Sequence, residues 1–405
     1  MPRNPVVEQL LARLTEIREA SGKSSDELDE ELILGPGWIA RFESGDTVPA
    51  LDVLVVILDA LGSNLQDLLA GIDIDAPVAD ATTSVDRFIH AEQDEDDLFG
   101  GLRIHFRYAD HDAVYRLQDA NEDQFEEVVK TLRNGLARLV HDDSEGQQSI
   151  KTNAVANAFL KAVSLWPDAN PSDLWWFVIS RAYLDPFNHP AQFARLDLGQ
   201  SWKRTGGWAL EEVLVRHYRD ALAAHGIRMF IAHGDEKEHF LGQLEVADRL
   251  ESDKVDVLLV GDDHGDRLCF GVVHVKASFA ERRTDDVPMS KALVEAGYTS
   301  PLWTMDSKST PASEPRNRGE LGLARLATTD SRSAKRKDIE EDGYFSACFS
   351  YNTNTIPTPD SQDVRARIFI CDFKDPTNDT FTTFIREAWE RFREENLAAG
   401  DSAGK

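Results

Sequence analysis

The sequence predicts a multidomain α + α/β protein, with a small all-α domain at the N-terminus and a larger domain built on a sheet flanked by helices. Three observations lead to this fold class. The first 72 residues carry apolar side chains at helical spacing. Two strand-like segments, KVDVLLVG and LCFGVVHVKAS, follow each other between Lys254 and Ser278. The length of 405 residues exceeds what one ordinary hydrophobic core holds.

The composition indicates the class of protein. Hydrophobic residues make up 41% of the chain, which is enough for sizeable cores. Its three cysteines, Cys269, Cys348 and Cys371, form no CxxC pair, so we expect neither a disulfide framework nor a cysteine-rich zinc site. The apolar runs are far shorter than the roughly 20 residues that span a bilayer, and the N-terminus lacks a signal-peptide pattern. We therefore expect a soluble cytoplasmic protein without a membrane partner.

Residues 1–72 are predicted to form five helices. The first ends at Gly22, Ser24 and Glu27 form a capping box for the second, and PGWIARFES makes a short third helix before two apolar ones. This layout resembles the Xre/Cro-type helix-turn-helix domain. Its third helix would then be the recognition helix, with Arg41 as its base-contacting cation. Because the domain has 5 Lys and Arg against 13 Asp and Glu, dimerisation or protein docking stays an alternative to DNA contact.

The acid-rich residues 73–101 have the composition of a linker. Order is expected to resume with the hairpin LRIHFRYADHDAVYRL. The predicted C-terminal domain therefore covers residues 102–405, with a helical subdomain at about 120–200 and a catalytic core at about 200–375.

The two strands from Lys254 to Ser278 carry a polar pair. Period-2 alternation places Asp256 on one face with Leu258 and Val260, and it places His274 and Lys276 together on a face of the next strand. Hydrolysis of a phosphodiester requires a divalent cation held by carboxylates, and a lysine beside that cation can orient or deprotonate the attacking water. We therefore expect Asp256 to bind metal and Lys276 to position water.

The layout of Asp256, a turn and His274-Val275-Lys276 resembles the PD-(D/E)xK nuclease fold, although His274 stands where that pattern has Asp or Glu. The segment HVKASFAERRTDD, with SPLWTMDSK and SWKRTGGWALE, further resembles the BsaWI-like branch of the CCGG-family type II restriction endonucleases over roughly residues 150 to 350. The resemblance implies a restriction-endonuclease-like mixed sheet, Mg²⁺ as the cofactor, and a displaced carboxylate in place of the acid at position 274.

Two glutamates are candidates for that carboxylate. Glu281 follows Lys276 by five residues, and Glu211 lies on a helix stripe with Trp208, Val215, Tyr218 and Leu222 that predicts burial. A buried carboxylate needs a partner, so Glu211 is expected to bind metal or to form a salt bridge with Lys203 or Arg204. His274 is either a catalytic residue or a hydrogen-bond partner of a neighbouring strand.

The charged string after Lys276 suits the reading of G·C base pairs. Arginine can bond guanine O6 and N7 together, and aspartate can accept from cytosine N4. The resemblance places Arg282, Arg283 and Asp285 in this role, and the alternative is a solvated loop. A net charge of −28 argues against a broad DNA-binding surface, so the contact must use a local basic cleft. Positive charge also gathers between Arg316 and Lys337.

These observations and the resemblance together predict a Mg²⁺-dependent type II restriction endonuclease that cuts double-stranded DNA at a short G·C-rich palindrome containing CCGG. A palindrome implies two-fold protein symmetry, so we expect at least a homodimer. Two alternatives remain. One is a helix-turn-helix transcriptional regulator with a C-terminal sensing domain. The other is a catalytically inactive nuclease fold that serves as a DNA-binding module, which the histidine at position 274 motivates.

Overall fold

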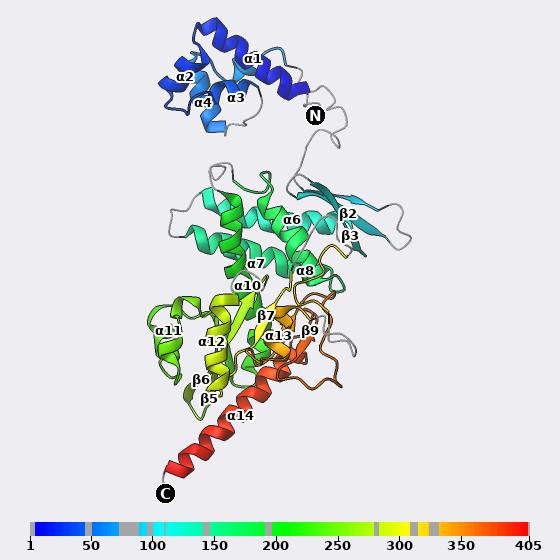
Figure 1. Ribbon diagram of the computed structural model, residues 1–405. Coiled ribbons are helices and arrows are strands. Elements are labelled where there is room, and N and C mark those ends of the chain that lie inside the picture. The colour runs from blue at the N-terminus through cyan, green and yellow to red at the C-terminus, as the bar shows by residue number, and fades with distance from the viewer. Residues whose placement is uncertain are drawn as a thin grey trace. The chain divides into compact units, whose positions relative to one another are not determined.

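The computed structural model divides the chain into two compact units, Met1–Arg87 and Phe88–Lys405, each considered by itself (Figure 1). The structure describes residues 5–44, 51–72, 89–94, 100–108, 111–140, 146–190, 197–278, 283–307, 315–323 and 332–403.

The first unit contains the five expected helices, and its small core is formed by their inward-facing leucine, isoleucine and phenylalanine side chains. The helices are α1 (Pro5–Ser21), α2 (Ser25–Glu31), α3 (Trp38–Glu43), α4 (Leu51–Ala60) and α5 (Leu65–Leu69). The capping box is confirmed, because the Glu27 amide donates to Ser24 Oγ and the Ser24 amide donates to Glu27 Oε2.

Helices α2 and α3 are joined by a buried carboxylate. Helix α3 begins after Gly37, which has no side chain to accept hydrogen bonds from the first amides of the helix. Asp29 of α2 is the acceptor instead, because its carboxylate accepts from the amides of Trp38 at 3.0 Å and Ile39 at 2.9 Å. This contact fixes the start of α3 against α2.

The second unit starts with an antiparallel sheet of β1 (Ile89–Gln93), β2 (Gly101–Tyr108) and β3 (His111–Gln118). The predicted hairpin is present as β2 and β3. Strand β1 was not expected, because it lies within residues 73–101, which were predicted as a linker. Its one acid, Glu92, is accommodated on the sheet, where it lies 3.3 Å from Arg103 and 3.1 Å from His105. The domain boundaries themselves stay a prediction.

A helical layer follows the small sheet, as the sequence predicts for residues 120–200. Helix α6 packs on α7, and α7 packs on α10. Trp175 is a core residue. The layer consists of α6 (Glu122–Ala137), η1 (Arg138–Val140), α7 (Gln147–Leu165), α8 (Pro171–Asp173), the π-helical η2 (Leu174–Ser180), α9 (Arg181–Leu184) and α10 (Leu198–Ala223).

The central sheet has the strand order β4-β5-β6-β7-β8-β9, with antiparallel pairing from β4 to β6 and parallel pairing from β6 to β9. The strands are β4 (Ile227–Phe230), β5 (Val257–Asp263), β6 (Asp266–Lys276), β7 (Leu302–Thr304), β8 (Cys348–Ser350) and β9 (Ile368–Ile370). The mixed sheet expected from the sequence is therefore confirmed.

Helices cover both faces of this sheet (Figure 1). Val257 and Leu259 pack toward α10 and α14, whereas Leu258 and Val260 pack toward α11 and α12. The remaining elements are α11 (Gly234–Leu241), η4 (Ala247–Arg249), η5 (Ser252–Lys254), α12 (Arg283–Glu295), α13 (Ala334–Glu340) and α14 (Thr380–Ala403). The face that carries α12 is the one that matters for the candidate site.

The three cysteines are free thiols in the interior. Burial raises the pKa of the Cys269 thiol to about 12, and it raises those of Cys348 and Cys371 as well. Among the helices of the described ranges, none combines the length and the apolar character that crossing a membrane requires.

Ile33 should destabilise the first unit through its backbone. Its φ is +55°, and its side chain is 92% exposed, so this β-branched residue is strained without a packing gain. We predict that Ile33→Gly stabilises the unit by about 1 kcal/mol. Amide hydrogen exchange of α1 to α5 in the full chain measures this change. Ile33→Ala is the control, since it shortens the side chain and keeps the strain. Equal protection in Ile33→Gly and the parent would contradict the expectation.

Gly271 allows β6 to approach the segment before β7. A Cβ at this position would lie 2.0 Å from the Thr299 carbonyl oxygen, and the two residues form a parallel bridge. We predict that Gly271→Ala lowers the stability of the second unit by roughly 1–3 kcal/mol, seen as a lower melting temperature. The matched control is Gly207→Ala on α10, where nothing lies within 4 Å of the added Cβ. Unchanged melting of Gly271→Ala would refute the close approach.

Candidate active site

The antiparallel pairing of β5 and β6 brings Asp256 and Lys276 to the same edge of the central sheet. Asp256 directly precedes β5, Lys276 ends β6, and Val257 pairs with Val273 between them. Lys276 Nζ lies 2.6 Å from Asp256 Oδ2, which also accepts from the Val275 amide at 2.9 Å. Both side chains are 7% exposed. The structure thus assembles the pair that the alternation of the two strands predicts.

A second carboxylate reaches the lysine from helix α12. Asp286 Oδ2 lies 3.5 Å from Lys276 Nζ, and the Asp286 side chain is 2% exposed. Lys276 is therefore placed between two acids, one at the start of β5 and one on the helix that covers this face. We call Asp256, Lys276 and Asp286 the acid-lysine cluster.

Sequence reasoning missed Asp286 because it considered only Arg282, Arg283 and Asp285 of the charged string, as base-reading residues or as a solvated loop. Helix α12 begins at Arg283 and includes Asp286. A signal was present in the sequence, since Asp286 shares helical spacing with Met289, Ser290 and Leu293, all of which are buried. An acid on a buried stripe requires a partner, and here that partner is Lys276.

His274 is fully buried beside the cluster. Its Nε2 lies 3.0 Å from Ser300 Oγ, which in turn lies 2.7 Å from Ser290 Oγ, and its Nδ1 lies 3.9 Å from Asp286 Oδ1. Burial lowers the pKa of the imidazole to about 4, so the ring is neutral near pH 7. Of the two expectations, the geometry agrees with a hydrogen bond toward a neighbouring strand, here to Ser300 just before β7, and the ring has no exposed atom for substrate.

Of the two other predicted metal ligands, the structure describes only Glu211. Glu211 lies on α10 and is partly buried, while Trp208 of the same predicted stripe is 43% exposed, so that stripe does not lie fully inward. Glu281 lies outside the described residues. Within the ranges that the structure describes, no three His, Cys, Asp or Glu side chains are grouped as a metal site. That Glu211 or Glu281 binds the metal stays a prediction.

The predicted base-contacting residues lie between Lys276 and Asp286 in the chain. Arg283 and Asp285 lie in the first turn of α12 and not in a loop. Nothing further is described of their side chains, and Arg282 lies outside the described residues. In the first unit, Arg41 is exposed on α3, with Nη1 3.5 Å from the Pro36 carbonyl oxygen.

The acid-lysine cluster has the chemistry of a cation site next to a proton-handling amine. Its two carboxylates supply the hard oxygen ligands that Mg²⁺ and similar ions prefer. A lysine side chain has three N–H donors on a flexible stem, so it can leave a carboxylate and donate to water or to an anionic oxygen.

Comparisons with known proteins agree with both units. A helix-turn-helix domain model matches residues 9–70, which contain α2 to α5 and most of α1. The chain is 41% identical over 241 residues to the type II restriction enzyme AgeI of Thalassovita gelatinovora, an alignment that covers 58% of this chain and 82% of that relative.

A solved structure of the same relative also matches this chain. The specific restriction endonuclease AgeI–DNA complex matches with a TM-score of 0.61 and 34% identity, over 71% of this chain and 99% of that one. The pre-specific BsaWI–DNA complex matches with a TM-score of 0.35 and 18% identity, over 68% and 95%, and such a low score adds no support. On the identity and coverage shared with AgeI, this chain belongs to the type II restriction endonucleases, which are site-specific deoxyribonucleases.

Proposed function

We propose that the chain cleaves double-stranded DNA with Mg²⁺ at a short G·C-rich palindrome that contains CCGG. The observation that supports this proposal is the position of Lys276 between Asp256 and Asp286. Hydrolysis of a phosphodiester needs oxygen ligands for a cation beside a group that handles the attacking water. These three side chains supply both.

The two carboxylates fit a divalent cation because they already enclose a positive charge. Lys276 Nζ lies 2.6 Å from one and 3.5 Å from the other. When bound, Mg²⁺ would neutralise charge on the phosphate and lower the pKa of a water. We propose Asp256 and Asp286 as its protein ligands, so that Asp286 is the displaced carboxylate. Glu211 and Glu281 remain candidates for a further ligand.

Lys276 is proposed to act on the attacking water. Its ammonium must move from Asp256 toward solvent to do so, and the four-carbon stem permits this movement. The neutral ring of His274 lies behind Asp286 and is fixed by Ser300, so we propose that it positions Asp286 and does not transfer protons.

Recognition of bases is proposed for Arg282 and for two residues of the first turn of α12. Arg282 and Arg283 would bond guanine, and Asp285 would accept from cytosine N4 in the major groove. The DNA in the solved AgeI complex supports double-stranded DNA as the partner. A palindromic site would require two copies related by a two-fold axis, so we propose a homodimer on DNA.

The first unit adds a second possible DNA contact. Arg41 is exposed on α3, the helix that inserts into the major groove in helix-turn-helix proteins. Its acidic surroundings leave dimerisation or protein docking as the alternative. We further propose a cytoplasmic setting, which the three free, buried cysteines support.

We predict that the purified chain cuts plasmid DNA into discrete fragments with Mg²⁺, and that Asp256→Asn and Lys276→Ala cut at least about 100-fold more slowly, because each removes a metal ligand or the amine. The matched control is Asp266→Asn, an exposed acid at the opposite end of β6, which should cut at the parental rate. Sequence-selective binding of DNA without any cutting by the parent would favour an inactive nuclease fold or a regulator.

We predict that Asp286→Asn raises the Mg²⁺ concentration needed for half-maximal cleavage by about 10- to 100-fold, and that a chelator abolishes cleavage by the parent. Glu211→Gln and Glu281→Gln in the same titration decide whether either residue is a further ligand. Circular dichroism checks that each variant is folded. If folded Asp286→Asn needs the same Mg²⁺ concentration as the parent, Asp286 is not a metal ligand.

A further inference from the structure

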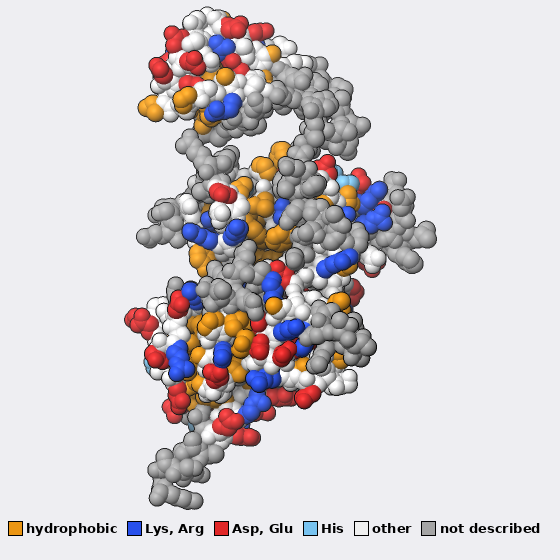
Figure 2. All heavy atoms as spheres, in the orientation of Figure 1, with side chains coloured by type: hydrophobic (Ala, Val, Ile, Leu, Met, Phe, Trp, Pro, Cys, Tyr) orange, Lys and Arg blue, Asp and Glu red, His pale blue; other side chains and the backbone are white. Residues whose placement is uncertain are grey.

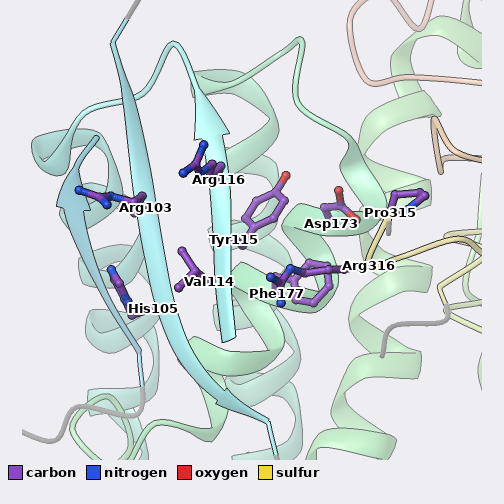
Figure 3. Close-up of a pocket in the computed structure, with 9 residues that line it drawn as sticks. All are labelled: Arg103, His105, Val114, Tyr115, Arg116, Asp173, Phe177, Pro315 and Arg316. Atoms are coloured by element: carbon purple, nitrogen blue, oxygen red, sulfur yellow. The ribbon is translucent and has the colours of Figure 1, made fainter. Parts of the chain in front are cut away.

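A group of arginines lines a cavity of the second unit, and none of the residues that line this cavity belongs to the acid-lysine cluster. A cavity of about 610 Å³ is bounded by β2 and β3 on one side and by η2 and the segment 315–323 on the other (Figure 3). Three guanidinium groups line it, Arg103 from β2, Arg116 from β3 and Arg316 from the segment. We call these three residues the arginine tract. Figure 2 shows Lys and Arg side chains gathered around β2 and β3 on the visible face.

Carboxylates orient two members of the tract, Arg103 and Arg116. Arg103 lies 3.3 Å from Glu92 and 3.5 Å from the buried Asp94, which is also 3.7 Å from Arg116. The side chain of Arg116 is nevertheless 69% exposed and that of Arg103 30%. A guanidinium has five N–H donors, so these contacts leave donors for a ligand. Asp173 also lines the cavity, but its Oδ1 accepts from Asn317 at 2.9 Å.

The segment that carries Arg316 is held by buried amides. Asn317 is 1% exposed, and its side-chain amide donates to Ser172 Oγ at 2.7 Å and to Asp173. Its backbone carbonyl accepts from Asn354 Nδ2 at 2.8 Å. The backbone next to Arg316 is therefore tied to the helical layer and to the segment after β8. These contacts hold in place the backbone from which the guanidinium extends.

The same segment is tied to the edge of the sheet that carries Lys276. Asp306 follows β7, and its carboxylate accepts from the amides of Glu320 at 2.6 Å and Leu321 at 3.1 Å. The Met305 amide donates to the Lys276 carbonyl oxygen at 3.1 Å. Asp306 has φ +42°, a strained conformation that persists where surrounding contacts enforce it and that is common at functional sites. The arginine tract and the active site thus share one framework.

We propose that the arginine tract binds the phosphodiester backbone of the DNA duplex, outside the bases that are cut. The inference rests on the proposed function. Guanidinium groups pair well with phosphate oxygens, and such contacts position a duplex without reading its sequence. A net charge of −28 works against DNA binding, so phosphate contacts depend on places where arginines from separate segments converge. The tract should raise affinity for every duplex alike.

The test is equilibrium binding of the full chain to fluorescent duplexes of about 30 base pairs, with and without CCGG, in chelator so that no DNA is cut. We expect Arg116→Ala and Arg316→Ala to weaken binding to both duplexes by about 3- to 10-fold, and to reduce the slope of log K against log salt by about 0.9 for each phosphate that the variant no longer neutralises. Arg116→Lys should retain most of the affinity, because it keeps the charge.

The matched control is Arg267→Ala, which removes an exposed arginine at the end of β6 opposite Lys276 and should leave affinity and slope unchanged. If the parent cuts DNA and both alanine variants keep its affinity and slope, the inference is wrong and the proposed function stands. A loss confined to the CCGG duplex would also overturn it, since it would assign these arginines to base reading. A parent that neither binds nor cuts DNA would overturn the proposed function and the inference together.

Discussion

The contact between the Lys276 ammonium and two carboxylates is the interaction on which the candidate site depends. Asp256 and Asp286 are both nearly inaccessible to water, and removing a carboxylate from water costs roughly several kcal/mol unless a counter-charge compensates it. Lys276 provides that charge from between them. The same arrangement concentrates oxygen ligands and one amine at a single point. Charge compensation in the folded chain and the chemistry proposed for it therefore come from the same three side chains.

A polar network at the same sheet edge fixes the surroundings of that contact. Asn352 lies after β8, accepts from Asn170 of the helical layer at 3.0 Å, and donates to the Asp306 carbonyl oxygen at 2.9 Å. Burial raises the pKa of Asp306 to about 6, while its hydrogen bonds from Thr355 and from the amides of Glu320 and Leu321 favour the charged form. Asn352 connects the helical layer to Asp306, and Asp306 accepts from the backbone amides of Glu320 and Leu321. The helical layer, the sheet and the segment 315–323 are therefore connected through one network.

The parts of the site that depend on local patterns could be predicted from the sequence. Asp256 and Lys276 lie on consecutive strands, so alternation and a short turn are sufficient to bring them to one edge. Asp286 could not be located in the same way, since its partner depends on how α12 packs on the sheet. Strand β1 was missed because it lies among the acid-rich residues 73–101, which have the composition of a linker, and the cross-strand contacts of Glu92 become visible only in the fold. The tethering of the segment 315–323 by distant asparagines leaves no local pattern in the sequence.

The placement of the three cysteines has a practical consequence. Because all of them are interior thiols with raised pKa values, thiol-directed reagents should leave the native chain unlabelled. A cysteine introduced at an exposed position such as Asp266 would then be a unique attachment point for a fluorophore. Individual molecules could be observed in this way on a stretched duplex, without first replacing any native residue of the interior.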